Sequence, residues 1–234
     1  MDRDLRALFD PRSVAVVGAS NDPAKWGHWV AQGALAAEHR RAVYLVNRSG
    51  GEVLGRPSYP SLAELPAAAE MVVIAVPEAA FEETVDASLA AGARALVAIT
   101  AGLGESGEEG AARERAVAER VRAAGAMLLG PNCLGVYDAD SELDLGANEF
   151  VPGPIALVSQ SGNLALEVSL LAADVGLGIS RFASLGNQAD LEVAELVRAL
   201  GEHDGTRAIG VYCEDFRDGR EFARAAREVV ARAG

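Results

Sequence analysis

The chain has 234 residues, of which 50% are hydrophobic and 24% charged, a composition typical of globular proteins with one large domain or two small ones. Its 34 acidic residues against 21 lysines and arginines give a net charge of −13, which argues against nucleic acid or an anionic membrane as a general partner. There is no apolar run of membrane-spanning length, no signal-peptide pattern in residues 1–13 and no CxxC pair, so we expect a cytoplasmic protein without a metal site.

Apolar runs alternate with helical patterns through the first half of the chain, as in parallel strands that are covered on both faces. Strands are expected at 13–19, 42–47, 71–77, 95–100 and 126–130, with helices at about 26–38, 79–91 and 107–124 and a short helix at 61–66. This order predicts an α/β fold with a doubly wound parallel sheet.

The turn after the first strand, "VVGASNDPAKWGHWV", holds Gly18 and Gly27. Glycines here let backbone approach a ligand, and the N–H groups at a helix start suit a phosphate. The turn lacks the G-x-G-x-x-G pattern, which weakens a dinucleotide assignment, and a turn without any ligand is the plainer alternative.

The second strand ends in Asn47 and Arg48. A site for a free ribose 2′-hydroxyl usually has an acid here, whereas a cation suits a phosphorylated ribose. The residues therefore leave two ligands open, NADP and the 3′-phosphate of coenzyme A, beside the alternative that Arg48 is a solvated surface charge.

A second series of elements follows, with strands expected at 154–160, 179–186 and 207–214 and helices to about 175, near 190–201 and to about 232. The polar, turn-rich stretch 137–153 is interpreted as a linker between a domain at 1–136 and one at 154–234. Three strands are few for such a domain, so the second unit is interpreted as truncated.

The stretch "ALVSQSGNLALEV" raises the choice between a serine nucleophile and an anion cradle. A G-x-S-x-G elbow is absent, and none of the three histidines (His28, His39 and His203) lies in a recognisable partner motif, which disfavours a hydrolase. A helix N-terminus that binds an anion is favoured, or one that is merely capped, and its residues are Ser159, Ser161, Gly162 and Asn163.

Several segments together resemble one family: "LFDPRSVAVVGASNDPAKWGHWV", "VNRSGGEVLGRPSYPSLAELP", "ITAGLGESGEEG", "LLGPNCLGV", "GPIALVSQSGNLALEV", "SLGNQADLEVAELVRAL" and "GVYCEDFRDGREFA". They look like the NDP-forming (ADP-forming) acyl-CoA synthetases, which include the alpha subunit of succinyl-CoA synthetase. The resemblance implies a Rossmann-like CoA-binding domain followed by a flavodoxin-like, succinyl-CoA synthetase-like domain.

The resemblance also implies site residues. Those that would hold CoA are Gly18, Ala19, Ser20, Lys25 and Gly27 at its phosphates, Asn47 and Arg48 at the 3′-phosphate, Val76 and Pro77 at the adenine, Thr100, Ala101, Gly102 and Glu105 along the pantetheine arm, and Asn132 and Cys133 near the thiol. The residues alone leave Cys133 equally well explained as a small packed thiol.

In the family, the helix start at Ser159–Asn163 receives a phosphorylated histidine, and a glutamate that Glu214 matches orients its ring. The histidine segment and the ATP-grasp domain are expected to lie outside this chain, and His203 is interpreted as a solvated turn residue. The implied reaction is acyl-CoA + ADP + phosphate ⇌ acid + CoA + ATP.

Partners and alternatives follow from this resemblance. CoA and an acyl group are the expected substrates; ATP, ADP and Mg²⁺ would enter through an ATP-grasp domain or subunit, and a homo-oligomer stays open. The alternatives are a non-catalytic CoA-binding regulatory module and an NADP-dependent oxidoreductase.

Overall fold

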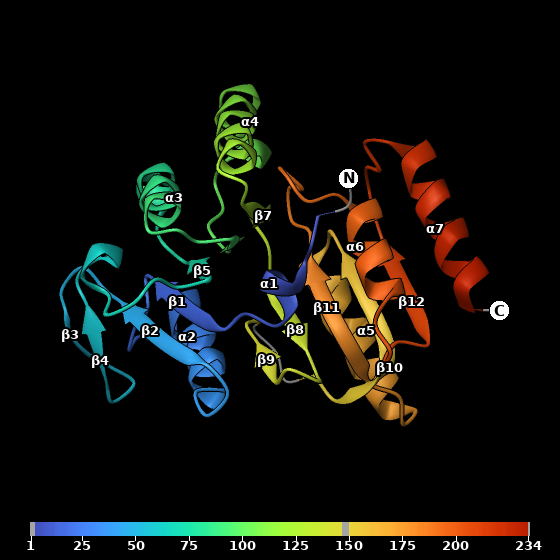
Figure 1. Cartoon of the computed structure of the whole chain (residues 1–234), viewed down its shortest axis with the longest axis horizontal. Coiled ribbons are helices and arrows are strands. Elements are labelled where there is room, and N and C mark those ends of the chain that lie inside the picture. The colour runs from blue at the N-terminus through green and yellow to red at the C-terminus, as the bar shows by residue number, and fades with distance from the viewer. Residues whose placement is uncertain (1–2, 147–149, 234) are drawn as a thin grey trace.

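The first of two sheets contains the five parallel strands predicted from the sequence. The computed structural model describes residues 3–146 and 150–233 (Figure 1). In spatial order the first sheet consists of β3 (Gly51–Val53), β4 (Arg56–Tyr59), β2 (Ala42–Val46), β1 (Ser13–Val17), β5 (Met71–Ile74), β6 (Ala95–Ala98) and β7 (Met127–Leu129). The strands from β2 to β7 all pair in parallel, and their burial on both faces explains the unbroken apolar runs.

Three crossover helices cover this sheet: α2 (Trp26–Ala36), α3 (Phe81–Ala90) and α4 (Glu108–Ala123). The chain leaves β1 toward one edge through α2, and leaves β5 toward the other edge through α3 and α4. Because such crossovers are right-handed, α2 lies on the opposite face from α3 and α4, as Figure 1 shows. The strand order reverses between β1 and β5, and ligands bind at such a switch point.

Two features near the edge of the first sheet differ from the prediction. β3 and β4 form an antiparallel hairpin that turns at Leu54 and Gly55, both with positive φ. The helix expected at 61–66 is a single 3₁₀ turn at Leu62–Glu64. A further short helix, α1 (Arg6–Phe9), precedes β1.

The second sheet has five strands where three were predicted. Its order is β12 (Ala208–Tyr212), β10 (Pro152–Ser159), β11 (Ile179–Ser184), β8 (Val136–Asp138) and β9 (Leu143–Asp144), and its helices are α5 (Gly162–Asp174), α6 (Val193–Gly201) and α7 (Gly219–Ala233). Among the described residues, no helix is both long and apolar enough to cross a membrane.

Residues 137–153, predicted as a linker, contribute β8 and β9 to this second sheet. β8 pairs antiparallel with β11, and the buried Asp138 accepts hydrogen bonds from Arg181 and from the N–H of Ser141. The polar residues that suggested a linker are therefore partnered inside the fold, because a buried carboxylate requires such partners.

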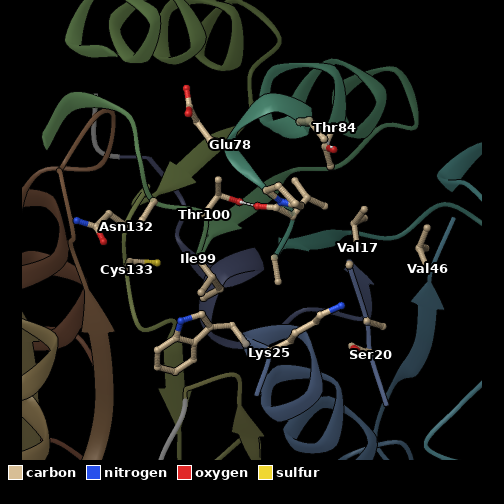
Figure 2. A pocket seen from close by; sticks show the side chains of 18 of the residues that line it. Val17, Ser20, Lys25, Val46, Glu78, Thr84, Ile99, Thr100, Asn132 and Cys133 are labelled. Carbon is tan, nitrogen blue, oxygen red and sulfur yellow. Dashed lines mark hydrogen bonds between the residues drawn. The ribbon is translucent and has the colours of Figure 1, made fainter. Parts of the chain in front are cut away.

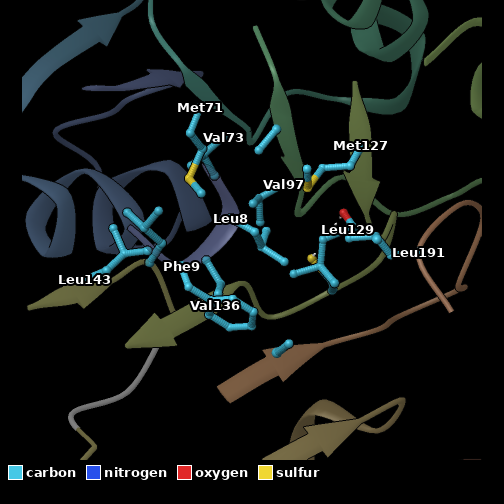
Figure 3. Packing of buried hydrophobic residues seen from close by; sticks show 14 of the residues in the cluster. Leu8, Phe9, Met71, Val73, Val97, Met127, Leu129, Val136, Leu143 and Leu191 are labelled. Carbon is cyan, nitrogen blue, oxygen red and sulfur yellow. Dashed lines mark hydrogen bonds between the residues drawn. The ribbon is translucent and has the colours of Figure 1, made fainter. Parts of the chain in front are cut away.

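The two sheets share one hydrophobic core (Figure 3). Side chains of α1 pack between the two sheets, with residues of the first sheet on one side and of β8 and β9 on the other; the cluster includes Leu8, Phe9, Val73, Val97, Leu129, Val136 and Leu143. A continuous core fixes the two units relative to each other, so a cleft between them has defined walls.

Candidate functional site

A cleft of about 1400 Å³ opens at the carboxyl ends of β1, β2, β5 and β6 and reaches the start of α5 in the second unit. Most of the predicted site residues line it: Gly18, Ala19, Ser20, Lys25, Asn47, Arg48, Val76, Pro77, Thr100, Ala101, Asn132, Cys133, Ser161, Gly162 and Asn163. The other predicted residues, all within the described part of the chain, lie outside its lining: Gly27, Gly102, Glu105, Ser159 and Glu214.

The two glycines of the first turn permit close packing of the protein's own backbone. Gly18 has φ +92°, and a Cβ atom there would lie 2.3 Å from the carbonyl oxygen of Ala75. A Cβ atom on Gly27 would lie 2.0 Å from the carbonyl oxygen of Gly18. Gly27 thus lets α2 pack closely against the turn and does not line the cleft. Gly18 packs against the backbone of Ala75 and also lines the cleft.

Lys25 and Arg48 are the basic side chains among the described residues that line the cleft. Both are exposed, and neither forms an ion pair within the described part of the chain. Asn47 fixes the backbone before Arg48, because its Nδ2 donates to Ala19 O at 2.8 Å and its Oδ1 accepts from Ser49 N at 2.9 Å. Two unpaired cations in a concave site favour a ligand with negative charges.

Thr100 connects the carboxyl ends of β5 and β6 at the cleft. Its side chain is buried, and its Oγ1 donates to Val76 O at 2.8 Å (Figure 2). The backbone N–H of Asn132 in turn donates to Thr100 O at 2.8 Å, with Asn132 at φ +55°. These bonds place the ends of β5 and β6 and the loop after β7 around one space.

Cys133 is a packed thiol. It is 4% exposed, and its Sγ donates to Ala98 O at 3.2 Å. Burial raises the pKa of the Cys133 thiol to about 12, so the thiolate is absent at neutral pH. Of the two explanations left open by the sequence, the structure supports packing rather than nucleophilic chemistry.

Asn187, which the sequence analysis did not single out, holds Glu105 and Asn132 together beside the cleft. Its Nδ2 donates to Glu105 Oε2 at 2.5 Å, and its Oδ1 accepts from Asn132 Nδ2 at 3.2 Å. Burial would raise the pKa of Glu105, but hydrogen bonds from the N–H of Gly102 and from Asn187 outweigh it and lower that pKa. Glu105 therefore stabilises the loop that borders the cleft. In the sequence, the "GNQ" turn that contains Asn187 is the feature that could have indicated this contact.

The start of α5 is a capped helix N-terminus, as predicted. Ser161 is its N-cap, with Oγ accepting from Leu164 N at 3.4 Å. Ser159 is fully buried and its Oγ donates to Ser161 O at 2.6 Å. The two serine hydroxyls thus serve the backbone at the start of this helix.

His203 was interpreted as solvated, and the structure corrects this. Its side chain is 7% exposed, with Nε2 2.9 Å from Asp140 Oδ2 and Nδ1 3.0 Å from Thr206 Oγ1. The contact with Asp140 depends on the fold of residues 137–153, which sequence reasoning treated as a linker.

Glu214 follows β12, and Gln160 connects it to the start of α5 by hydrogen bonds. Gln160 is another residue that the sequence did not single out. The side-chain oxygen of Gln160 accepts from the N–H of Glu214 and, at 3.1 Å, from that of Asp215. Tyr212 Oη donates to Glu214 Oε1 at 3.3 Å, and the carboxylate is otherwise exposed. A strand-end acid and a helix N-terminus are thereby brought to one place.

Comparisons with known families cover nearly the whole chain. Residues 12–139 match the model of a CoA binding domain, and residues 152–233 match a succinyl-CoA ligase like flavodoxin domain. The cleft described above lies mainly within the first match and reaches the second at α5.

Two similar proteins of Pyrococcus furiosus are the alpha subunits of acetate–CoA ligase [ADP-forming] I and II. They are 37% and 36% identical over 96% and 97% of this chain, which spans 50% of the length of each. A crystal structure from Pyrococcus horikoshii has a TM-score of 0.92 at 34% identity, with 96% of this chain and 52% of that chain covered. A dinucleotide forming acetyl-coenzyme A synthetase of Ca. Korarchaeum cryptofilum has a TM-score of 0.89 at 32% identity and covers 100% of this chain and 50% of its own.

Proposed function

We propose that this chain, which belongs to the CoA-binding domain family and is homologous to alpha subunits of ADP-forming acetate–CoA ligases, forms the CoA-binding part of an ADP-forming acyl-CoA synthetase. The whole enzyme would convert acyl-CoA, ADP and phosphate to the acid, CoA and ATP. An ATP-grasp domain or subunit would bind ATP and Mg²⁺ and supply the rest of the site. We place this activity in the cytoplasm.

The observation that carries the proposal is the pair of unpaired cations in the cleft that opens at the strand switch point. Lys25 lies at the N-cap of α2 beside the Gly18 turn, where backbone N–H groups favour a diphosphate. Arg48 follows β2, the strand end at which a ribose phosphate is expected. An elongated molecule with phosphates at both places and an apolar arm would match the length of the cleft.

We assign the start of α5 and Glu214 to a phosphohistidine that lies outside this chain. The N-terminus of α5 presents N–H groups that favour a phosphoryl group, with Ser161 as its cap. A carboxylate that accepts one imidazole N–H fixes the tautomer and leaves the other nitrogen free to carry phosphate. Gln160 would hold the backbone of Glu214 beside this helix start.

The experiment is a calorimetric titration of the chain with CoA, dephospho-CoA and NADPH. Charge-assisted hydrogen bonds contribute roughly 1.5–3 kcal/mol, so dephospho-CoA or Arg48→Ala should weaken binding about tenfold or more. The matched control is Arg56→Ala, since Arg56 is exposed on the neighbouring β4 but paired with Glu38 outside the cleft.

Three outcomes would contradict the proposal. Binding of NADPH in preference to CoA would favour an oxidoreductase. Equal affinity for CoA and dephospho-CoA would remove Arg48 from the site. CoA binding by a chain that stays inactive when it is extended through the phosphohistidine segment and supplied with an ATP-grasp partner would favour the regulatory module instead.

A further inference from the structure

Trp26 is a large aromatic side chain left half-exposed inside the cleft. It is the first residue of α2, it is 50% exposed and it lines the cleft. Its indole N–H has no hydrogen-bond partner among the described residues. Trp29, the other tryptophan of the chain, lies outside that lining, and its indole N–H donates to Pro23 O at 2.9 Å. The two tryptophans are therefore distinguishable by their surroundings.

Trp26 lines the cleft from the start of a helix that packs against the second unit. Trp26, Val30 and Ala34 share one helical face, and Val30 and Ala34 are buried. On the neighbouring row, a Cβ atom on Gly33 would lie 2.1 Å from Asp144 O, so α2 runs directly against β9 of the second sheet. Trp26 therefore begins a helix that packs between the two units.

The cleft that Trp26 lines also has apolar walls where it reaches the second unit. Ile99, Cys133 and Leu134 line it, and a Cβ atom on Gly162 would lie 2.7 Å from Leu134 Cδ1, so Leu134 bridges to the start of α5. In the proposed function, the CoA thiol and the phosphorylated intermediate meet between Cys133 and α5. An acyl group in transit must lie there.

The cations of the cleft lie elsewhere. Figure 2 shows Lys25 extending toward the side that holds Val17 and Ser20, with Asn132 and Cys133 on the opposite side. Arg48, the other basic residue of the described lining, follows β2. The described lining thus holds no basic side chain besides Lys25 and Arg48 for a second carboxylate, and burying one unpaired beside Cys133 is unfavourable. Arg217, which lies outside this lining, donates to Asn187 O at 3.3 Å.

We propose that Trp26 binds the acyl group, with Ile99 and Leu134, and that the acids handled at this site carry an aromatic or bulky apolar tail rather than a second carboxylate. Aromatic rings pack on one another in offset or edge-to-face geometry, with a gain beyond the area they bury. This proposal rests on the proposed function, because it requires CoA in the cleft.

The test compares CoA, acetyl-CoA, succinyl-CoA and phenylacetyl-CoA in calorimetric titrations of the wild type, Trp26→Val and the control Trp29→Val. We expect phenylacetyl-CoA to bind about five- to tenfold more tightly than acetyl-CoA to the wild type and the control. Trp26→Val should abolish this preference, with CoA affinity in all three proteins equal within about twofold. Succinyl-CoA should bind no more tightly than acetyl-CoA.

A second variant distinguishes loss of the aromatic ring from misfolding of the protein. Trp26→Phe keeps an aromatic ring and should retain most of the preference for phenylacetyl-CoA. With Trp29→Phe, Trp26 is the single tryptophan, so its fluorescence should change more on binding phenylacetyl-CoA than on binding CoA.

Each contrary result has a definite meaning. If Trp26→Val weakens CoA and phenylacetyl-CoA by the same factor, Trp26 contacts CoA itself and the acyl assignment is wrong. Tightest binding of succinyl-CoA would also overturn it, while leaving CoA binding established. If no thioester and no CoA binds, the proposed function fails and this inference fails with it.

Discussion

At the residue scale, the cleft is built from side chains at the ends of single elements and from residues whose partners are distant along the chain. The unpaired Arg48 was identified from its position at a strand end, a local property of sequence, and Lys25 from the family resemblance. The role of Gly27 was not, because its missing Cβ faces Gly18 O across a tertiary contact. Asn187 was missed for the same reason: its partners lie 55 and 82 positions away along the chain.

The state of Cys133 allows a direct test at this scale. Because burial raises its pKa to about 12, Cys133 should resist iodoacetamide in the native protein at pH 8, while the partly exposed Cys213 reacts slowly. Mass spectrometry should therefore find one modified cysteine in the wild type, none in Cys213→Ala, and Cys133 labelled after urea unfolding. Rapid native labelling of Cys133 would contradict the packed-thiol assignment.

The same thiol affects stability at alkaline pH. The unfolded chain releases the Cys133 proton near its ordinary value of 9, and the folded chain near 12. Between these values the folded state binds more protons than the unfolded state, so the free energy of unfolding falls as pH rises. Cys133→Ala should flatten this part of the stability profile.

At the scale of elements, the long strands and helices were predictable and the shortest strands were not. A period-two pattern needs about four to eight residues, whereas β3 and β8 have three residues and β9 has two. β8 also pairs with β11, and β9, β10 and α5 lie between the two strands along the chain. Short strands with distant partners are specified by tertiary structure and leave little local signal.

The cleft depends on how closely α2 packs against the turn that contains Gly18. In Gly27→Ala the new methyl group would lie 2.0 Å from Gly18 O, so α2 must shift away from β1. We expect the free energy of unfolding to fall by more than about 2 kcal/mol and CoA affinity to fall with it. Urea denaturation and a CoA titration measure the two effects.

Gly219→Ala is the matched control, since Gly219 begins α7 and a Cβ atom there meets nothing within 4 Å. Alanine in a helix is favoured over glycine, so this variant should be unchanged or more stable by up to about 1 kcal/mol. Similar losses in both variants would show that the close approach of α2 to the Gly18 turn is not what fixes the helix.

At the scale of the whole molecule, the two α/β units could be predicted from alternating patterns, but their junction could not. Residues 189–191 run along the open edge of β7, with Ala189 N donating to Gly130 O at 3.1 Å and Leu191 N to Leu128 O at 3.2 Å. This covers an edge that would otherwise expose unpaired backbone groups. Nothing in the "QADLEV" sequence indicates that it pairs with a strand of the other unit.

Asp190 is the centre of this junction. Its carboxylate has no exposed surface and accepts from Leu128 N at 2.9 Å, Arg122 Nε at 2.6 Å and Arg3 Nη1 at 2.8 Å. The three donors belong to β7, α4 and the N-terminal segment, all outside the second sheet. A buried carboxylate with this many partners stabilises the docked arrangement, and its removal leaves the buried Leu128 N–H unpaired.

Asp190→Ala should therefore lower the free energy of unfolding by about 2–4 kcal/mol in urea denaturation, because the Leu128 N–H loses its acceptor and two arginines lose their shared partner. Asp190→Asn, which keeps an acceptor oxygen for Leu128, should lose less.

Asp86→Ala is the control: Asp86 also pairs with an arginine of α4, Arg120 at 3.0 Å, but its side chain is 57% exposed. Exposed pairs contribute about 0–1 kcal/mol, so this variant should stay close to the wild type. Hydrogen exchange at the Leu128 amide should accelerate in Asp190→Ala and not in Asp86→Ala. Equal small losses in Asp190→Ala and Asp86→Ala, with Leu128 still protected, would mean that the shared apolar core alone holds the two units together.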